Sequence, residues 1–316
     1  MRAILLGPQR RPTVDSVVRS LFPDGPFATV TAGWQERESE DGELNALLGG
    51  RGVGLGLYRR WLDVQERDPE YAAAERAVAG VLAELQDLHL LRLDYALQAV
   101  YALQRRAAGS TAGGAAGEAV AGAGAVAEAV AAVRELDAAQ LHRVNEVRGE
   151  FFGRLRPHDR PAIAEHRAAV AGHVSSAAAL IVAGGHVGVL AEVLHLFNVA
   201  AVLRTPVIAW SAGAMALTDR IVLFGDRSPH GPGHPEVYGS GLSVVRDLVL
   251  LPHARARLLL DDTPRMGVFV QRFAPARCLP LDQGARVEVD GSGGPLPPGT
   301  RVLAADGHVT AVGEAA

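Results

Sequence analysis

The sequence contains no lysine, and all 31 basic residues among its 316 positions are arginine. The formal net charge is −4 and no block of basic residues occurs, so neither a nucleic-acid surface nor an anionic-membrane surface is indicated. Cys278 is the only cysteine, which excludes an internal disulfide and favours a reducing, cytoplasmic location. Its apolar segment, Arg-Cys-Leu-Pro-Leu, predicts a buried strand residue and not a nucleophile.

Long apolar runs are scarce as well. The apolar run at the N-terminus is too short for a signal peptide. The longest stretch without a charged residue, 168–191, is long enough for a bilayer but is interrupted by Ser175, Ser176, Gly184 and Gly185. We therefore interpret it as the end of a helix, a strand, a turn and a new helix, and predict no membrane span.

Short apolar runs alternate with helical patterns at both ends of the chain. This alternation predicts an α/β fold with a mainly parallel open sheet flanked by helices. After Cys278, turns at Asp290-Gly291 and Asp306-Gly307 predict short antiparallel strands at the sheet edge. The expected strands are 2–7, 27–31, 55–58, 179–183, 206–210, 221–224 and 248–252, and the expected helices are 13–22, 187–203 and 263–273.

A different pattern occupies the middle of the chain. Apolar residues between Val78 and Tyr95 recur at steps of three or four, which is helical spacing. Residues 125–154 also read as a helix, and the Ala/Gly/Ser-rich segment 107–124 predicts a flexible connection. The predicted organisation is an α/β domain of residues 1–60 and 174–316 with a helical insertion, 61–173. Its apolar surface favours a homodimer, with the insertion at the interface or over the active site, against a monomer in which it folds back on its own sheet.

The segment from Thr205 to Met215 has the pattern of a nucleophile elbow. An apolar strand runs into Ser211, and small residues stand at Ala209, Gly213 and Ala214. A tight strand-to-helix turn exposes the serine oxygen, and the helix N-terminus favours developing negative charge. The sequence thus predicts Ser211 as the attacking group and the N–H of Ala212 as an oxyanion donor.

Other residues fit roles around this serine. Gly185 ends the preceding expected strand and is predicted to supply a second oxyanion N–H, although glycines also serve ordinary tight turns. His253 follows the strand 248–252, so it is the expected general base at the carboxyl edge of the sheet. His230 and His234 are alternative candidates for the general base. Their His-x-x-x-His spacing is similar to that of metal ligands, but they lie in a Pro/Gly-rich loop and no third ligand is evident. No metal or cofactor is expected.

The segment Ala209-Trp-Ser-Ala-Gly-Ala214 resembles the elbow of the dipeptidase E and cyanophycinase family, serine peptidases on a class I glutamine-amidotransferase-like fold. Gly184-Gly185 is similar to the family's glycine pair, and His253 with Arg255 and Arg257 is similar to its His-and-Arg segment. The resemblance covers residues 178–290 well and 1–58 loosely. It implies cleavage of small peptides or isopeptides next to aspartyl groups.

The resemblance leaves the acid of the triad open. Dipeptidase E-like members place an Asp shortly after the elbow, which implies Asp226 here, and this is the preferred assignment. Cyanophycinase-like members use a Glu in the closing segment, where this chain has Gln283 beside Asp282. The neutral amide of Gln283 can orient an imidazole but cannot stabilise its cation by charge.

Residues after the second expected strand could form the rim of the site. Trp34, Gln35 and Glu36 are candidates, and Glu36 and Glu38 could attract an amino terminus; a solvated helix start is the alternative.

Two functions compete at this point. The first is a serine hydrolase acting on peptides or isopeptides. The second is a binding or regulatory module that has kept the fold, which Gln283 and the insertion favour. A glutamine amidotransferase is third, since that class has Cys at the elbow. No nucleic-acid or membrane partner is expected.

Overall fold

The computed structural model describes residues 1–316 except 10–12, 23, 112–115, 226–232, 292 and 314–316. Its central sheet has six strands in the order β10-β1-β5-β4-β2-β3, and all neighbouring pairs are parallel except β10 with β1. This confirms the predicted α/β class and the antiparallel strand at the sheet edge. The strands are β1 (Arg2–Leu6), β2 (Phe27–Val30), β3 (Gly52–Gly54), β4 (Ala179–Val182), β5 (Val207–Trp210) and β10 (Arg286–Asp290).

Both faces of this sheet are covered, which explains why its inner strands are apolar runs without alternation. Ile4 and Leu6 of β1 pack on one face with the helices α1 (Val14–Leu21) and α2 (Gly42–Leu47). Ala3 and Leu5 point to the other face, because successive side chains of a strand alternate. That face is covered by α3 (Leu57–Arg67), α6 (Pro161–Ser176), α7 (Val187–Leu196), α8 (Val199–Val202) and α9 (Ala212–Ala216).

Three small two-stranded sheets complete the carboxyl-terminal half. β6 (Ile221–Leu223) pairs antiparallel with β7 (Glu236–Gly239), and β8 (Leu248–Pro252) pairs parallel with β9 (Arg277–Leu281). β11 (Arg301–Leu303) and β12 (Val309–Ala311) form the last antiparallel pair. The helices α10 (Ala254–Arg257) and α11 (Thr263–Phe273) lie beside them.

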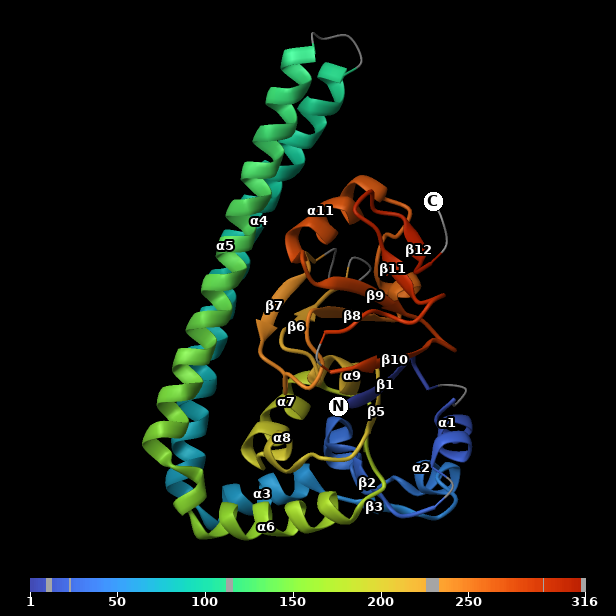
Figure 1. Ribbon diagram of the computed structural model, residues 1–316. Helices are drawn as coiled ribbons and strands as arrows, with labels where there is room; N and C mark the ends of the chain where they lie inside the picture. Colours follow the sequence, from blue (N-terminus) through green and yellow to red (C-terminus); the bar gives the residue numbers. More distant parts are fainter. Residues whose placement is uncertain (10–12, 23, 112–115, 226–232, 292, 314–316) are drawn as a thin grey trace.

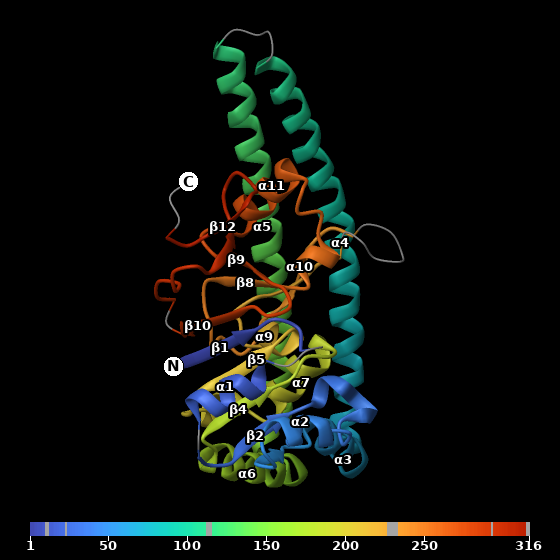
Figure 2. The same cartoon turned by 90° about the vertical axis from the view of Figure 1, so that its right-hand side faces the viewer.

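The helical insertion is a long antiparallel hairpin of α4 (Pro69–Thr111) and α5 (Ala116–Leu155). It lies along one side of the α/β body and extends past α11 (Figures 1 and 2). The predicted flexible connection over 107–124 is wrong for most of its length, because both helices continue into it. Alanine is the strongest helix former, so an Ala-rich segment beside a partner helix stays helical.

The third strand also differs from its expected position. We expected residues 55–58, but β3 is Gly52–Gly54 and α3 begins at Leu57. The glycines around this strand hid it, since its parallel pairing with β2 uses backbone groups and needs no apolar side chains.

A buried ion pair fastens the hairpin to the body. Arg272 of α11 donates two hydrogen bonds to Asp137 of α5, at 2.6 and 2.7 Å, and both side chains are only 2% exposed. The same guanidinium donates to the carbonyl of Pro235 at 2.6 Å. The helices α5 and α11 and the residue before β7 are thereby held at one point.

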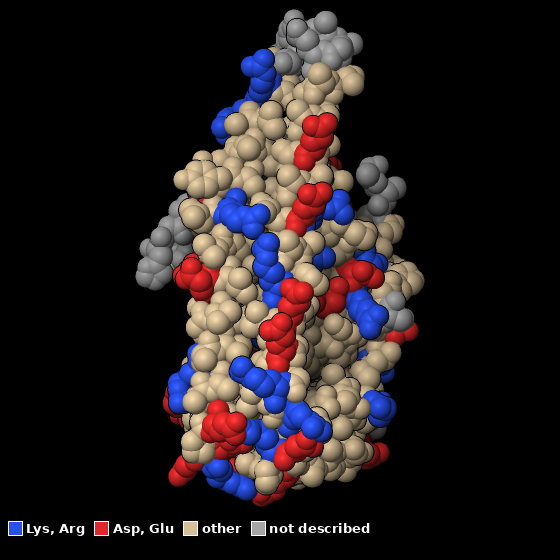
Figure 3. All heavy atoms as spheres, turned by 90° about the vertical axis from the view of Figure 1, so that its left-hand side faces the viewer, with Lys and Arg blue, Asp and Glu red and all other residues tan. Residues whose placement is uncertain are grey.

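The outer face of α4 carries an apolar stripe made of Val81, Leu88, Leu91 and Tyr95, each about half exposed or more. Acidic and basic side chains are interspersed on the hairpin face of the molecule, with no extended patch of one sign (Figure 3). None of the helices in the described ranges has the length and apolar character needed to cross a membrane.

Candidate active site

Ser211 occupies a strained turn between β5 and α9. Its backbone has φ 52° and ψ −127°, a conformation that side-chain-bearing residues rarely adopt. Gly213 permits this turn to press against the neighbouring strand, since a Cβ there would lie 2.4 Å from the carbonyl oxygen of Val182 and 2.5 Å from that of Ala183. The elbow shape predicted from the sequence is therefore present.

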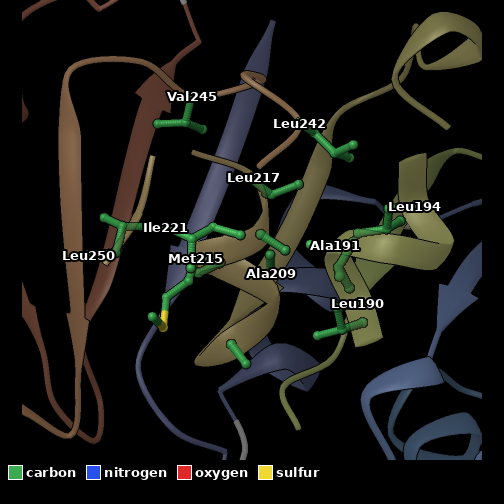
Figure 4. Packing of buried hydrophobic residues seen from close by; sticks show 14 of the residues in the cluster. Leu190, Ala191, Leu194, Ala209, Met215, Leu217, Ile221, Leu242, Val245 and Leu250 are labelled. Atoms are coloured by element: carbon green, nitrogen blue, oxygen red, sulfur yellow. The ribbon is translucent and has the colours of Figure 1, made fainter. Parts of the chain in front are cut away.

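Tight apolar packing holds the elbow in place. Met215, Leu217 and Ile221, in and after α9, lie between the α7 residues Leu190 and Leu194 and the strand β8 (Figure 4). Ser211 therefore has a rigid support on both sides, which a strained backbone needs in order to persist.

The Gly184-Gly185 turn lies directly against the serine. The register pairs Val182 with Ala209, so β4 and β5 end side by side. A Cβ on Gly184 would lie 2.9 Å from the Cβ of Ser211, and one on Gly185, which has φ 126°, would lie 2.3 Å from the carbonyl oxygen of Gly33. Only glycines allow this approach.

A cavity of about 330 Å³ opens at Ser211. Gly185 and Ala212 line it together with the serine, so both expected oxyanion residues face the same space. Their role as oxyanion donors stays a prediction. The full lining is Gly185, His186, Val187, Gly188, Ser211, Ala212, Met215, Leu223, Phe224, Tyr238, Pro252 and Arg257.

His253 stands at the end of β8, in a left-handed conformation with φ 58°. Its N–H donates to the carbonyl of Leu281 at 3.1 Å, and the neighbouring Pro252 lines the serine cavity. The contact between the His253 ring and the Ser211 hydroxyl that a general base requires stays a prediction.

Of the candidate acids, Asp226 lies outside the described residues. Asp282 follows β9, whose register pairs Leu281 with Pro252, so Asp282 and His253 leave two parallel strands at the same edge. One oxygen of Asp282 accepts from the N–H of Arg255 at 3.0 Å, at the start of α10. Gln283 is exposed in the turn after β9. The identity of the triad acid stays a prediction.

Of the two alternative candidates for the general base, the structure describes only His234. His230 lies outside the described residues. His234 contacts Asp94 of α4 at 3.2 Å and stacks on Tyr101, so it faces the hairpin. Burial and nearby arginines lower its pKa. In the described part of the chain, no three His, Cys, Asp or Glu side chains come close enough together for a metal ion.

The expected rim residues lie near the site but are engaged elsewhere. Trp34 and Trp210 line a separate cavity of about 310 Å³. Glu36 accepts from the hydroxyl of Tyr58 at 3.0 Å, and Gln35 has φ 57° at a kink. Glu38, also considered for the rim, is buried and accepts from two N–H groups at the start of α3. Contact with substrate stays a prediction for Trp34, Gln35 and Glu36.

Two residues that sequence reasoning did not select also line the serine cavity. His186 directly follows the glycine pair, a position that could have marked it, and its Nδ1 accepts from the N–H of Val189 at 3.2 Å. Tyr238 comes from β7, and nothing in its local sequence signals this location. Arg257 lines the same cavity with its guanidinium 5.1 Å from the ring centre of Phe224.

No protein-family model matches the sequence, and a search of curated proteins gave no match. Among solved structures, the chain is similar to a peptidase from an acI-B1 Actinobacterium, with 13% sequence identity and a TM-score of 0.42. The likeness covers 99% of this chain and 95% of that chain. A likeness of this degree assigns no function, so the functional argument rests on the site itself.

Proposed function

We propose that this protein is a serine hydrolase of the dipeptidase E and cyanophycinase type, which cleaves small peptides or isopeptides through an acyl-enzyme on Ser211. The observation that carries the proposal is the strained backbone of Ser211 in the wall of a cavity. Strain of this kind persists where the surrounding structure enforces it, and such positions cluster at active sites.

In the proposed reaction the Ser211 hydroxyl attacks the scissile carbonyl while His253 takes its proton. The N–H groups of Gly185 and Ala212 stabilise the developing oxyanion. His253 then protonates the leaving amine. In the second step His253 takes a proton from water, which attacks the acyl-enzyme, and then returns the proton to Ser211 as the acid product leaves. Asp226 or Asp282 holds the imidazole in the required tautomer.

A fluorophosphonate probe tests this proposal. We expect labelling of the folded chain at Ser211, loss of labelling in Ser211→Ala, and strong loss in His253→Ala with the circular dichroism spectrum unchanged. Asp226→Asn and Asp282→Asn identify the acid, because the variant that removes it should lower the hydrolytic rate by about 10⁴-fold. A folded chain that does not react contradicts the proposal and favours a binding module.

A further inference from the structure

Three cavities follow one another from Ser211 to the base of the hairpin. The cavity at Ser211 shares Tyr238 with a second of about 350 Å³, which is also lined by α4 and α5. The second shares Ala79, Leu82, Arg148 and Glu192 with a third of about 370 Å³. Neighbouring cavities have lining residues in common, so the three lie in a row between the body and the hairpin, and this row is called the groove below; Tyr238 stands between the first and the second cavity.

One face of α7 runs along the whole groove. Gly188 lines the first cavity, Glu192 the second and third, and Leu196 the third. Residues four apart lie on the same side of a helix, and eight residues span about 12 Å. An extended peptide covers that distance with about three or four residues.

The polar side chains that line the middle cavity are Gln86, Asp87, Arg148, Glu192 and Tyr238. Arg148 of α5 has a buried Nε without a hydrogen-bond partner among the described residues. Glu192 lies in the same cavity, and burial raises the pKa of its carboxyl while the charge of Arg148 opposes that rise. In the described structure, the two side chains form no ion pair with each other. A donor and an acceptor on the two walls match the carbonyl and N–H groups of a peptide backbone.

The third cavity is aromatic. Glu75 at its wall already accepts from Trp61 at 2.9 Å, Gln65 at 2.6 Å and Tyr71 at 3.2 Å, so its carboxylate is occupied. The apolar part of the wall is suited to a large apolar side chain, and Arg76, Arg148 and Glu192 complete the lining. Its apolar lining is Trp61, Tyr71, Val78, Ala79, Leu82, Phe151, Phe152 and Leu196.

We propose that the hairpin is a substrate-recognition element: the groove holds an extended peptide, and its aromatic cavity takes a large apolar side chain about three or four residues from the scissile bond. This inference rests on the proposed hydrolase function for the meaning of Ser211, and adds to it a preference for peptides longer than a dipeptide.

Calorimetric titration of the Ser211→Ala chain tests the groove without any turnover. The probes are nine-residue Ala/Ser peptides with one Phe four positions before or after the centre, and the same peptide without Phe. We expect one Phe peptide to bind at least about tenfold more tightly than the peptide without Phe, since burial of the ring supplies that gain. Equal affinities for all three peptides would overturn the proposal.

Two variants locate the binding site. Ala79→Trp, in the wall shared by the second and third cavities, should abolish the gain from Phe. Ala77→Trp, also exposed on α4 but outside the lining of these cavities, should preserve it. Ala83→Trp, in the second cavity, replaces the first variant if circular dichroism shows that variant unfolded. Equal effects of the blocking variant and its control would refute the location.

The two proposals fail in different ways. Phe-dependent binding to a protein whose wild type resists the fluorophosphonate probe supports the groove and contradicts the hydrolase. Labelling at Ser211 without Phe-dependent binding supports the hydrolase and contradicts the groove.

Discussion

The backbone strain at Ser211 predicts that glycine at this position stabilises the protein while it removes the nucleophile. A non-glycine residue held at φ 52° and ψ −127° costs about 1–3 kcal/mol. Ser211→Ala keeps that cost, and Ser211→Gly relieves it. Glycine loses about 0.5–1 kcal/mol through its greater freedom in the unfolded chain. The glycine variant should therefore be more stable than the alanine variant by up to about 2.5 kcal/mol.

The free energy of unfolding is measured in guanidinium chloride, with unfolding followed by circular dichroism. The variants are compared when this free energy falls with denaturant concentration at the same slope in each. Ser16, in the first turn of α1, provides the control pair. There glycine should be less stable than alanine by about 1 kcal/mol, because the backbone is helical. If Ser211→Gly is no more stable than Ser211→Ala, the backbone strain at Ser211 is refuted, whatever the activity of the wild type.

Further predictions concern the remainder of the molecule. Asp137→Asn should cost about 3–5 kcal/mol of unfolding free energy at pH 7, since it leaves the buried charge of Arg272 without its partner; a loss below 1 kcal/mol would contradict this. Burial acts to raise the pKa of Asp137, but hydrogen bonds from Arg272 hold this pKa below its ordinary value. The stabilisation by the ion pair should therefore be complete above about pH 4 and lost as the pH falls through the lowered pKa. Acid titration of the wild type against Asp137→Asn checks this. Burial raises the pKa of Cys278 from 9.0 to about 12, so alkylation by iodoacetamide at pH 8 should be about 1000-fold slower in the native chain than in urea; equal rates would show an accessible thiol. We propose that the stripe on α4 pairs two copies of the chain: light scattering should give a dimer, and Leu88→Glu with Leu91→Glu a monomer, whereas a monomeric wild type would exclude the dimer.

Local patterns in the sequence predicted the elements that carry the site. The apolar run into Ser211 and the small residues after it indicated a strand, a tight turn and a helix, because these depend on neighbours a few residues away. The same holds for α11, predicted at 263–273, and for the hairpin helices, whose apolar spacing is helical. The connection at 107–124 was predicted wrongly because contact with a partner helix, and not local composition, decides its state.

Tertiary structure alone decided which of these elements meet. The pairing of β8 with β9, outside the central sheet, brings Asp282 to the edge where His253 stands. Trp34, expected at the rim, lies in a different cavity with Trp210. The hairpin, which lines two of the cavities beside α7, is fastened to α11 by the buried pair of Arg272 and Asp137. The periods of helices and strands depend on residues a few positions apart, whereas registers, cavities and buried ion pairs arise from packing between segments that are distant in the sequence.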